Sequence, residues 1–143
     1  MNKIFAAASA AVGLATLALA PTAVQAQDPT GPAMVDFLLN AVSDEFGLTV
    51  QSKTTGSLRQ GASGTGTLQV RAGSVVFIGV CDENCSDVDM IVRDSSGREV
   101  GRDFEEDDTP LVILDGAAAG RYTVEVQMPG CSGTCNWGVA AYN

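Results

Sequence analysis

The chain has 143 residues, with 17 acidic and eight basic side chains and no histidine, which gives a net charge of −9. A surface this negative repels nucleic-acid phosphates and anionic lipid headgroups, so we expect no binding to nucleic acid or to membrane surfaces. Without histidine, Ser-His-Asp and Cys-His catalytic arrangements are excluded. Few aromatic side chains are available to build a sugar-binding cleft, and we expect no enzyme.

The first 26 residues have the pattern of a secretory signal peptide. Lys3 precedes an apolar run at 4–20, and Val24 and Ala26 occupy the small-residue positions of a cleavage site after Ala26. No other segment is long and apolar enough to span a bilayer. We therefore expect an exported chain, periplasmic or extracellular, whose remaining 117 residues carry seven basic and 17 acidic side chains.

Residues 27–50 are predicted to form a helical segment with one apolar stripe. Thr30 could cap the helix, Pro32 would lie in its first turn, and Gly47 would end it. The stripe could pack against its own domain or dock onto a partner. Its expected members fall at helical spacing: Met34, Phe37, Leu38, Ala41, Val42 and Phe46.

The rest of the chain, residues 51–143, is predicted to be one all-β domain. The Gly-, Ser- and Thr-rich stretch 51–66 is interpreted as a loop or a weak edge strand around Leu58. Short alternating segments joined by Gly-rich turns then favour an antiparallel β-sandwich. Tyr122 and Trp137 are expected in its core. The expected strands are 67–70, 74–80, 88–94, 98–104, 110–114, 121–128 and 137–142.

These strands also carry a family resemblance. The segments "DVDMIVRD", "GREV", "DFEEDD", "PLVIL" and "AAAGRYTVEV" resemble the bacterial pre-peptidase C-terminal domain over about residues 56–143. The resemblance implies a jelly-roll-like β-sandwich of secreted proteins, usually an accessory module beside a catalytic domain. Related collagen-binding domains bind calcium. This chain departs from the pattern because it has no protease domain, and its paired C-x3-C loops resemble a stand-alone exported subgroup.

If each connection reverses direction, the loops at 81–87, 105–109 and 129–135 meet at one end of the sandwich. We therefore expect eight carboxylates to crowd there: Asp82, Glu83, Asp87, Asp89, Glu105, Glu106, Asp107 and Asp108. Their repulsion would be offset by a divalent cation or screened by salt. Calcium takes six to eight oxygen ligands. The candidate calcium ligands are Asp82, Asp87, Asp89, Glu105, Asp107 and Asp108, and both the calcium hypothesis and a solvated acidic rim stay open.

Four cysteines in an exported chain favour two structural disulfides. Zinc is disfavoured because no histidine can complete its ligands, and a redox pair is disfavoured because the spacing and context do not fit. Three pairings are open. We favour the local pairs Cys81–Cys85 and Cys131–Cys135, because each pair lies alone in a tight loop.

Together these features predict an exported, non-catalytic binding or accessory module for an unidentified protein or carbohydrate ligand. No cofactor is certain, and calcium is the candidate. The alternative is a structural envelope protein that assembles through its N-terminal helix.

Overall fold

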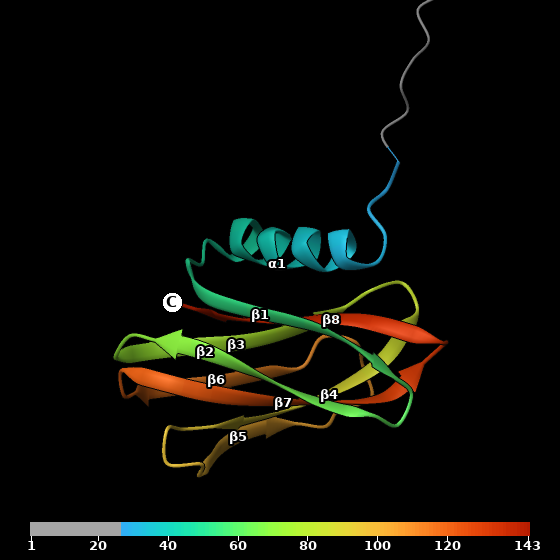
Figure 1. Cartoon of the computed structure of the whole chain (residues 1–143). Coiled ribbons are helices and arrows are strands. Elements are labelled where there is room, and N and C mark those ends of the chain that lie inside the picture. Colours follow the sequence, from blue (N-terminus) through green and yellow to red (C-terminus); the bar gives the residue numbers. More distant parts are fainter. Residues whose placement is uncertain (1–26) are drawn as a thin grey trace, which may run out of the picture.

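The computed structural model describes residues 27–143, which form one helix and eight strands (Figure 1). The predicted signal peptide lies outside the described residues. Within them, no helix has the length and apolarity to cross a bilayer. The elements in chain order are α1 (Pro32–Phe46), β1 (Val50–Arg59), β2 (Ser63–Val70), β3 (Gly73–Cys81), β4 (Cys85–Arg93), β5 (Glu99–Asp103), β6 (Leu111–Ala117), β7 (Gly120–Cys131) and β8 (Thr134–Tyr142).

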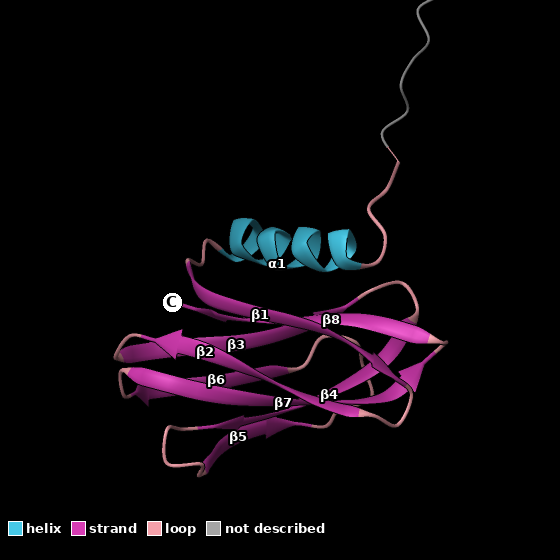
Figure 2. Ribbon diagram, in the orientation of Figure 1, coloured by secondary structure: helices cyan, strands magenta, loops and turns pink. Residues whose placement is uncertain are grey.

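The strands form two four-stranded antiparallel sheets, as Figure 2 shows. The first sheet has the order β1-β8-β3-β6, and the second has the order β2-β7-β4-β5. Every strand pairing in both sheets is antiparallel. The predicted all-β antiparallel sandwich preceded by a helix is therefore confirmed.

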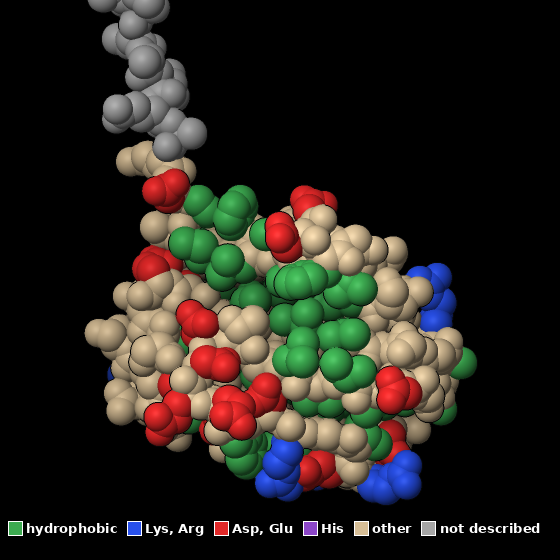
Figure 3. Space-filling model, turned by 180° about the vertical axis from the view of Figure 1, so that it is seen from behind, with side chains coloured by type: hydrophobic (Ala, Val, Ile, Leu, Met, Phe, Trp, Pro, Cys, Tyr) green, Lys and Arg blue, Asp and Glu red, His purple; other side chains and the backbone are tan. Residues whose placement is uncertain are grey.

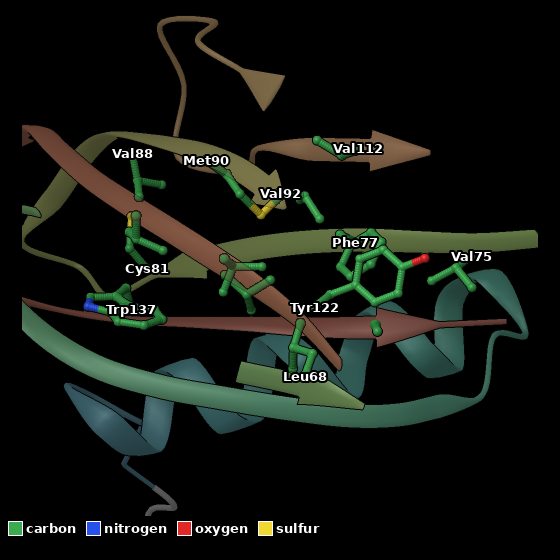
Figure 4. Close-up of a cluster of buried hydrophobic side chains, with 14 of the residues drawn as sticks. Leu68, Val75, Phe77, Cys81, Val88, Met90, Val92, Val112, Tyr122 and Trp137 are labelled. Atoms are coloured by element: carbon green, nitrogen blue, oxygen red, sulfur yellow. The ribbon is translucent and has the colours of Figure 1, made fainter. Parts of the chain in front are cut away.

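Inward-facing side chains of both sheets form the main core (Figure 4). Strand β7 alternates between buried and partly exposed positions, which places Tyr122, Val124 and Val126 in this core. The Phe77 and Tyr122 rings pack with centroids 5.6 Å apart. Trp137 is also buried in this core. The expectation that both Tyr122 and Trp137 are core residues is confirmed.

Of the two interpretations left open for 51–66, the edge strand around Leu58 is confirmed and the loop is wrong, because this stretch forms most of β1 and the beginning of β2, both of which are edge strands. The glycines of this stretch leave space for neighbouring side chains and do not interrupt the strands. A Cβ on Gly56 would lie 2.6 Å from Cζ2 of Trp137, and a Cβ on Gly66 would lie 2.4 Å from Cγ2 of Thr54. Some of the glycines that suggested turns in the sequence are thus required by packing, since glycine in a strand often marks the close approach of a neighbouring group.

The predicted position of the centre of the apolar stripe of α1 is wrong. Val35 and Leu39 are the buried residues of the helix, whereas Phe37 and Phe46 are 55% and 69% exposed. The helix packs against β8 and β3 of the first sheet. Gly138 lets it approach, because a Cβ there would lie 2.5 Å from Cγ1 of Val35. Which face of α1 is buried thus depends on Gly138, a small residue of the sheet. The helical periodicity of α1 cannot reveal this dependence.

Two hydrogen bonds fix the helix to the sandwich. The buried Tyr142 hydroxyl donates to the carbonyl of Leu39 at 2.9 Å, and burial raises the pKa of Tyr142 to about 12. The predicted Thr30 cap is wrong, because Gly31 is the N-cap and no side chain caps it. Instead, Gly31 N–H donates to the carboxylate of Glu83 at 3.0 Å. Gly47 ends the helix in the left-handed conformation, as expected.

Candidate functional site

The connections β3–β4, β5–β6 and β7–β8 meet at one end of the sandwich, as the strand directions predicted. Val88 N–H donates to the carbonyl of Asp107 at 2.9 Å, and Ser132 N–H donates to the carbonyl of Asn84 at 2.8 Å. These two bonds join β4 to the β5–β6 loop and the β3–β4 loop to the β7–β8 turn. We call this region the acidic end, defined by residues 81–89, 103–109 and 131–136.

Two disulfides staple the acidic end, with the local pairing Cys81–Cys85 and Cys131–Cys135. Cys85 and Cys131 are cross-strand partners of β4 and β7, so the two staples are neighbours in the fold. No cysteine among the described residues is free. The favoured pairing is confirmed.

Asp82 has a structural role within this end. It is buried, with 3% of its surface exposed. Its Oδ2 accepts hydrogen bonds from the backbone N–H and the side-chain amide of Asn136, at 2.9 and 2.6 Å, and its Oδ1 accepts one from the N–H of Asn84 at 3.2 Å. Oδ2 thus holds the β3–β4 loop against β8, and Oδ1 stabilises the turn of the loop itself.

Asp87 and Asp89 lie on β4 and are the most perturbed carboxylates of this end. Burial, followed by the charges of Glu106 and Asp107, raises the pKa of Asp87. Burial, followed by the charges of Asp87 and Asp103, raises the pKa of Asp89. Asp87 Oδ1 is also buried without a hydrogen-bond partner. The fold therefore brings like charges together, which lowers its stability. Among residues 27–143, no basic side chain pairs with Asp87 to offset this repulsion.

The candidate calcium ligands do not converge. Among residues 27–143, no three acidic, histidine or cysteine side chains are grouped as ligands of one metal ion. Glu105, Asp107 and Asp108 lie exposed in the β5–β6 loop. The N–H of Thr109 donates to Asp107 Oδ1 at 2.8 Å, which makes that carboxylate part of the turn. Calcium binding stays a prediction.

A second feature, an apolar groove, adjoins the acidic end and was missed by the sequence reasoning. It lies on the outer face of the first sheet, between α1 and β6, and contains two hollows of about 480 and 360 Å³ that share Phe46. Figure 3 shows apolar side chains gathered on this face, with acidic side chains along one side. We define the apolar groove by Leu38, Val42 and Phe46 of α1, Val76, Ile78 and Val80 of β3, and Leu111 of β6. We include Ile113 of β6, the exposed cross-strand partner of Val76, which also lines a neighbouring hollow that contains Arg98 and Arg121.

The groove exists because one helix covers only part of a four-stranded face. Strands lie about 4.8 Å apart and a helix is about 10 Å wide, so α1 covers roughly two strands. The edge strand β1 presents the exposed polar residues Lys53, Thr55 and Ser57, and Lys53 forms an ion pair with Asp36 of α1 at 2.6 Å. The uncovered edge strand β6 presents Leu111 and Ile113, which are 43% and 57% exposed.

A sequence signal for the groove was available in "LVIL" at 111–114. A strand that is apolar at both parities is typical of burial on both faces. Val112 and Leu114 pack in the main core, whereas Leu111 and Ile113 face outward. The run therefore predicts two apolar faces, and only the inner one is covered by this chain.

Comparisons with known proteins show similarity in structure alone. No protein-family model and no curated protein sequence matches the chain. We describe two of the solved structures that are similar to it. One is a pre-peptidase C-terminal domain. It belongs to a collagenase from Bacillus anthracis, is 14% identical, and aligns over 64% of this chain and 89% of its own with a TM-score of 0.49.

The second similar structure is PliG from Aeromonas hydrophila, a periplasmic inhibitor of g-type lysozyme. It is 18% identical and aligns over 63% of this chain and 84% of its own, with a TM-score of 0.45. The resemblance expected from the sequence motifs thus has a counterpart among the structural neighbours. At these identities the neighbours say nothing about the task of the present chain.

Proposed function

We propose that this protein is an exported, non-catalytic binding module that holds another macromolecule on the outer face of its first sheet. The observation that supports this role is the apolar groove: the exposed Phe46 and Leu111 line one hollow with Val76, and the exposed Ile113 is the cross-strand partner of Val76. Contiguous exposed apolar surface commonly marks an interaction site in a water-soluble protein. The absence of histidine and the two structural disulfides fit a binding role in an oxidising compartment.

Site-specific photo-crosslinking in cells that export the protein tests this role. A photoreactive residue replaces Ile113 in the groove or, as the matched control, the exposed Thr55 on the polar edge strand β1 at the opposite edge of the same sheet. A binding module gives a discrete adduct from position 113 and none from position 55. Equal labelling at both positions, or no adduct at either, would reject the groove as a binding surface.

Calcium belongs to the proposal as a stabiliser of the acidic end. The unpartnered Asp87 Oδ1 and the raised pKa values of Asp87 and Asp89 are the features that favour a cation there. Calcium would raise the melting temperature relative to chelator, and Asp87→Asn would remove that increase. The same melting temperature in calcium and in chelator would eliminate the hypothesis, with magnesium as the control for simple screening of charge.

The alternative, an envelope protein that assembles through its helix, is favoured by one observation: Phe37 is 55% exposed on α1. The face of α1 that contains Val35 and Leu39 is already used within the chain. Assembly would therefore use the opposite face. Oligomers at neutral pH that dissociate on Phe37→Ser, and that persist on Ile113→Ser, would replace the binding module with this role.

A further inference from the structure

The groove is negatively charged at the end where it meets the acidic end. Glu45 of α1 and Asp108 of the β5–β6 loop line the same hollow as Leu38 and Val42. Among the described residues that line the two hollows, none is Lys or Arg. An occupant of the groove thus meets apolar side chains along its length and carboxylates at the end near α1 and the β5–β6 loop, whereas the hollow beyond Ile113 is lined by both acidic and basic side chains.

The end of α1 adds to this negative potential. Asp44 and Glu45 lie in its last turn, which has no basic residue. The C-terminus of a helix carries partial negative charge, so acidic side chains there are unfavourable for the helix itself. Cationic groups brought by a partner would relieve this repulsion.

The shape of the opening favours a helix. Beside α1, the uncovered part of the face is the edge strand β6, next to the side of the helix that carries Leu38, Val42 and Phe46. Ile113 and Leu111 are cross-strand partners of Val76 and Ile78, so the outward-facing rows of β6 and β3 lie side by side. Leu111 and Ile113 are exposed, Val76 is partly exposed and Ile78 is buried. Such parallel apolar rows suit residues at i, i+3, i+4 and i+7 of an amphipathic helix.

From these observations, and resting on the proposed function above, we infer that the groove binds a basic amphipathic helix of a partner protein. The apolar stripe of that helix packs on Val76, Ile78, Leu111 and Ile113, and its Lys or Arg residues face Glu45 and Asp108. A second copy of this chain is disfavoured, because the 17 acidic against seven basic residues in 27–143 make two copies repel. An anionic lipid surface is disfavoured for the same reason.

Two designed helical peptides of about 18 residues test the inference. They share one Leu/Phe stripe, and their polar faces carry either Lys and Arg or Glu. Fluorescence anisotropy with the purified exported chain at low salt measures their affinities. We expect the basic peptide to bind at least tenfold more tightly than the acidic one, and its affinity to fall as salt rises.

Variants of the chain test whether the peptide binds in the groove. Ile113→Lys should weaken the basic peptide at least tenfold, whereas Thr55→Lys, which adds the same charge on the polar strand, should weaken it far less. The double variant Glu45→Lys/Asp108→Lys should narrow or invert the preference between the two peptides. Melting curves of each variant verify that the fold is retained.

Other outcomes overturn the inference in identifiable ways. Equal affinity for both peptides, or binding insensitive to Ile113→Lys, rejects a basic helix as occupant. Dimers at neutral pH that dissociate on Ile113→Lys would show that the groove binds a second copy of the chain. Flotation with phosphatidylglycerol vesicles assigns it to a membrane. If the cross-link at position 113 persists while the basic peptide fails to bind, the binding module stands and only the partner chemistry is wrong.

Discussion

At the scale of single residues, aspartates of one loop region have opposite consequences for stability. Asp82 accepts three hydrogen bonds and ties the β3–β4 loop to Asn136 and Asn84. Asp87 has a buried Oδ1 without a partner and lies near Glu106 and Asp107. In the sequence both appear as members of one acidic motif. The hydrogen-bond partners decide which carboxylate stabilises the fold and which one opposes it.

Asp82→Ala should lower the free energy of unfolding by about 2–4 kcal/mol, because the side chain of Asp82 is buried and the partly buried N–H donors that it accepts from, chiefly those of Asn136, lose their acceptor. Urea denaturation measures the change. Glu105→Ala is the matched control, since Glu105 is an exposed acidic residue of the same end, and its removal should change stability by less than about 0.5 kcal/mol. Equal effects of the two substitutions would contradict the structural role of Asp82.

Asp87→Asn should raise the melting temperature at pH 7 in the absence of calcium. The pKa of Asp87 is raised in the folded chain above its ordinary value, chiefly by burial. The folded state therefore binds the proton more tightly than the unfolded state, and its stability falls as pH rises through that range. The advantage of the variant should shrink as pH falls towards 4, which thermal melts from pH 4 to 7 measure. An advantage independent of pH would contradict the assignment.

At the scale of elements, glycines in strands set the distance between neighbouring parts. Gly56 leaves room for the Trp137 ring, and Gly138 leaves room for Val35 and Leu39 of α1. The seat of the helix on β8 and β3 leaves β6 uncovered and so creates one wall of the groove. The position of α1 is therefore a condition for the proposed site.

Gly138→Val should displace α1 and cost about 1–3 kcal/mol, because the new side chain overlaps Val35. Hydrogen exchange should increase throughout 32–46. Gly116→Val is the matched control on β6, where a Cβ meets nothing within 4 Å. If exchange in α1 is unchanged by Gly138→Val, the helix does not depend on this contact.

At the scale of the whole molecule, the strong negative charge and the exposed apolar face have opposite effects on self-association. The 17 acidic side chains keep copies apart at neutral pH, although Phe46, Leu111 and Ile113 offer surface for association. The balance depends on pH, since the ordinary pKa values of Asp and Glu are near 4. Charge and groove together make solubility conditional on ionised carboxylates.

The chain should be monomeric at pH 7 and should self-associate near pH 4, where its carboxylates become protonated. Sedimentation velocity measures both states. Ile113→Lys should suppress association at pH 4 because it places a charge in the groove, whereas Thr55→Lys, with the same added charge, should suppress it much less. Association at pH 4 that both variants suppress equally would show that net charge, and not the groove, controls it.

The sequence by itself predicted the alternating strands and the antiparallel sandwich, favoured the local disulfides, and predicted that the acidic loops meet at one end if each connection reverses direction. These follow from period-two alternation, from the short spacing of the cysteines and from the reversal of direction at each turn, all of which are local properties of the chain. Only the tertiary structure decided between loop and edge strand for residues 51–66, and showed that Val35 and Leu39 are the buried face of α1 and that Leu111 and Ile113 remain uncovered. Those outcomes depend on which residue of a distant strand lies opposite, such as Trp137 beside Gly56 or Gly138 beneath Val35, and no local pattern contains that information.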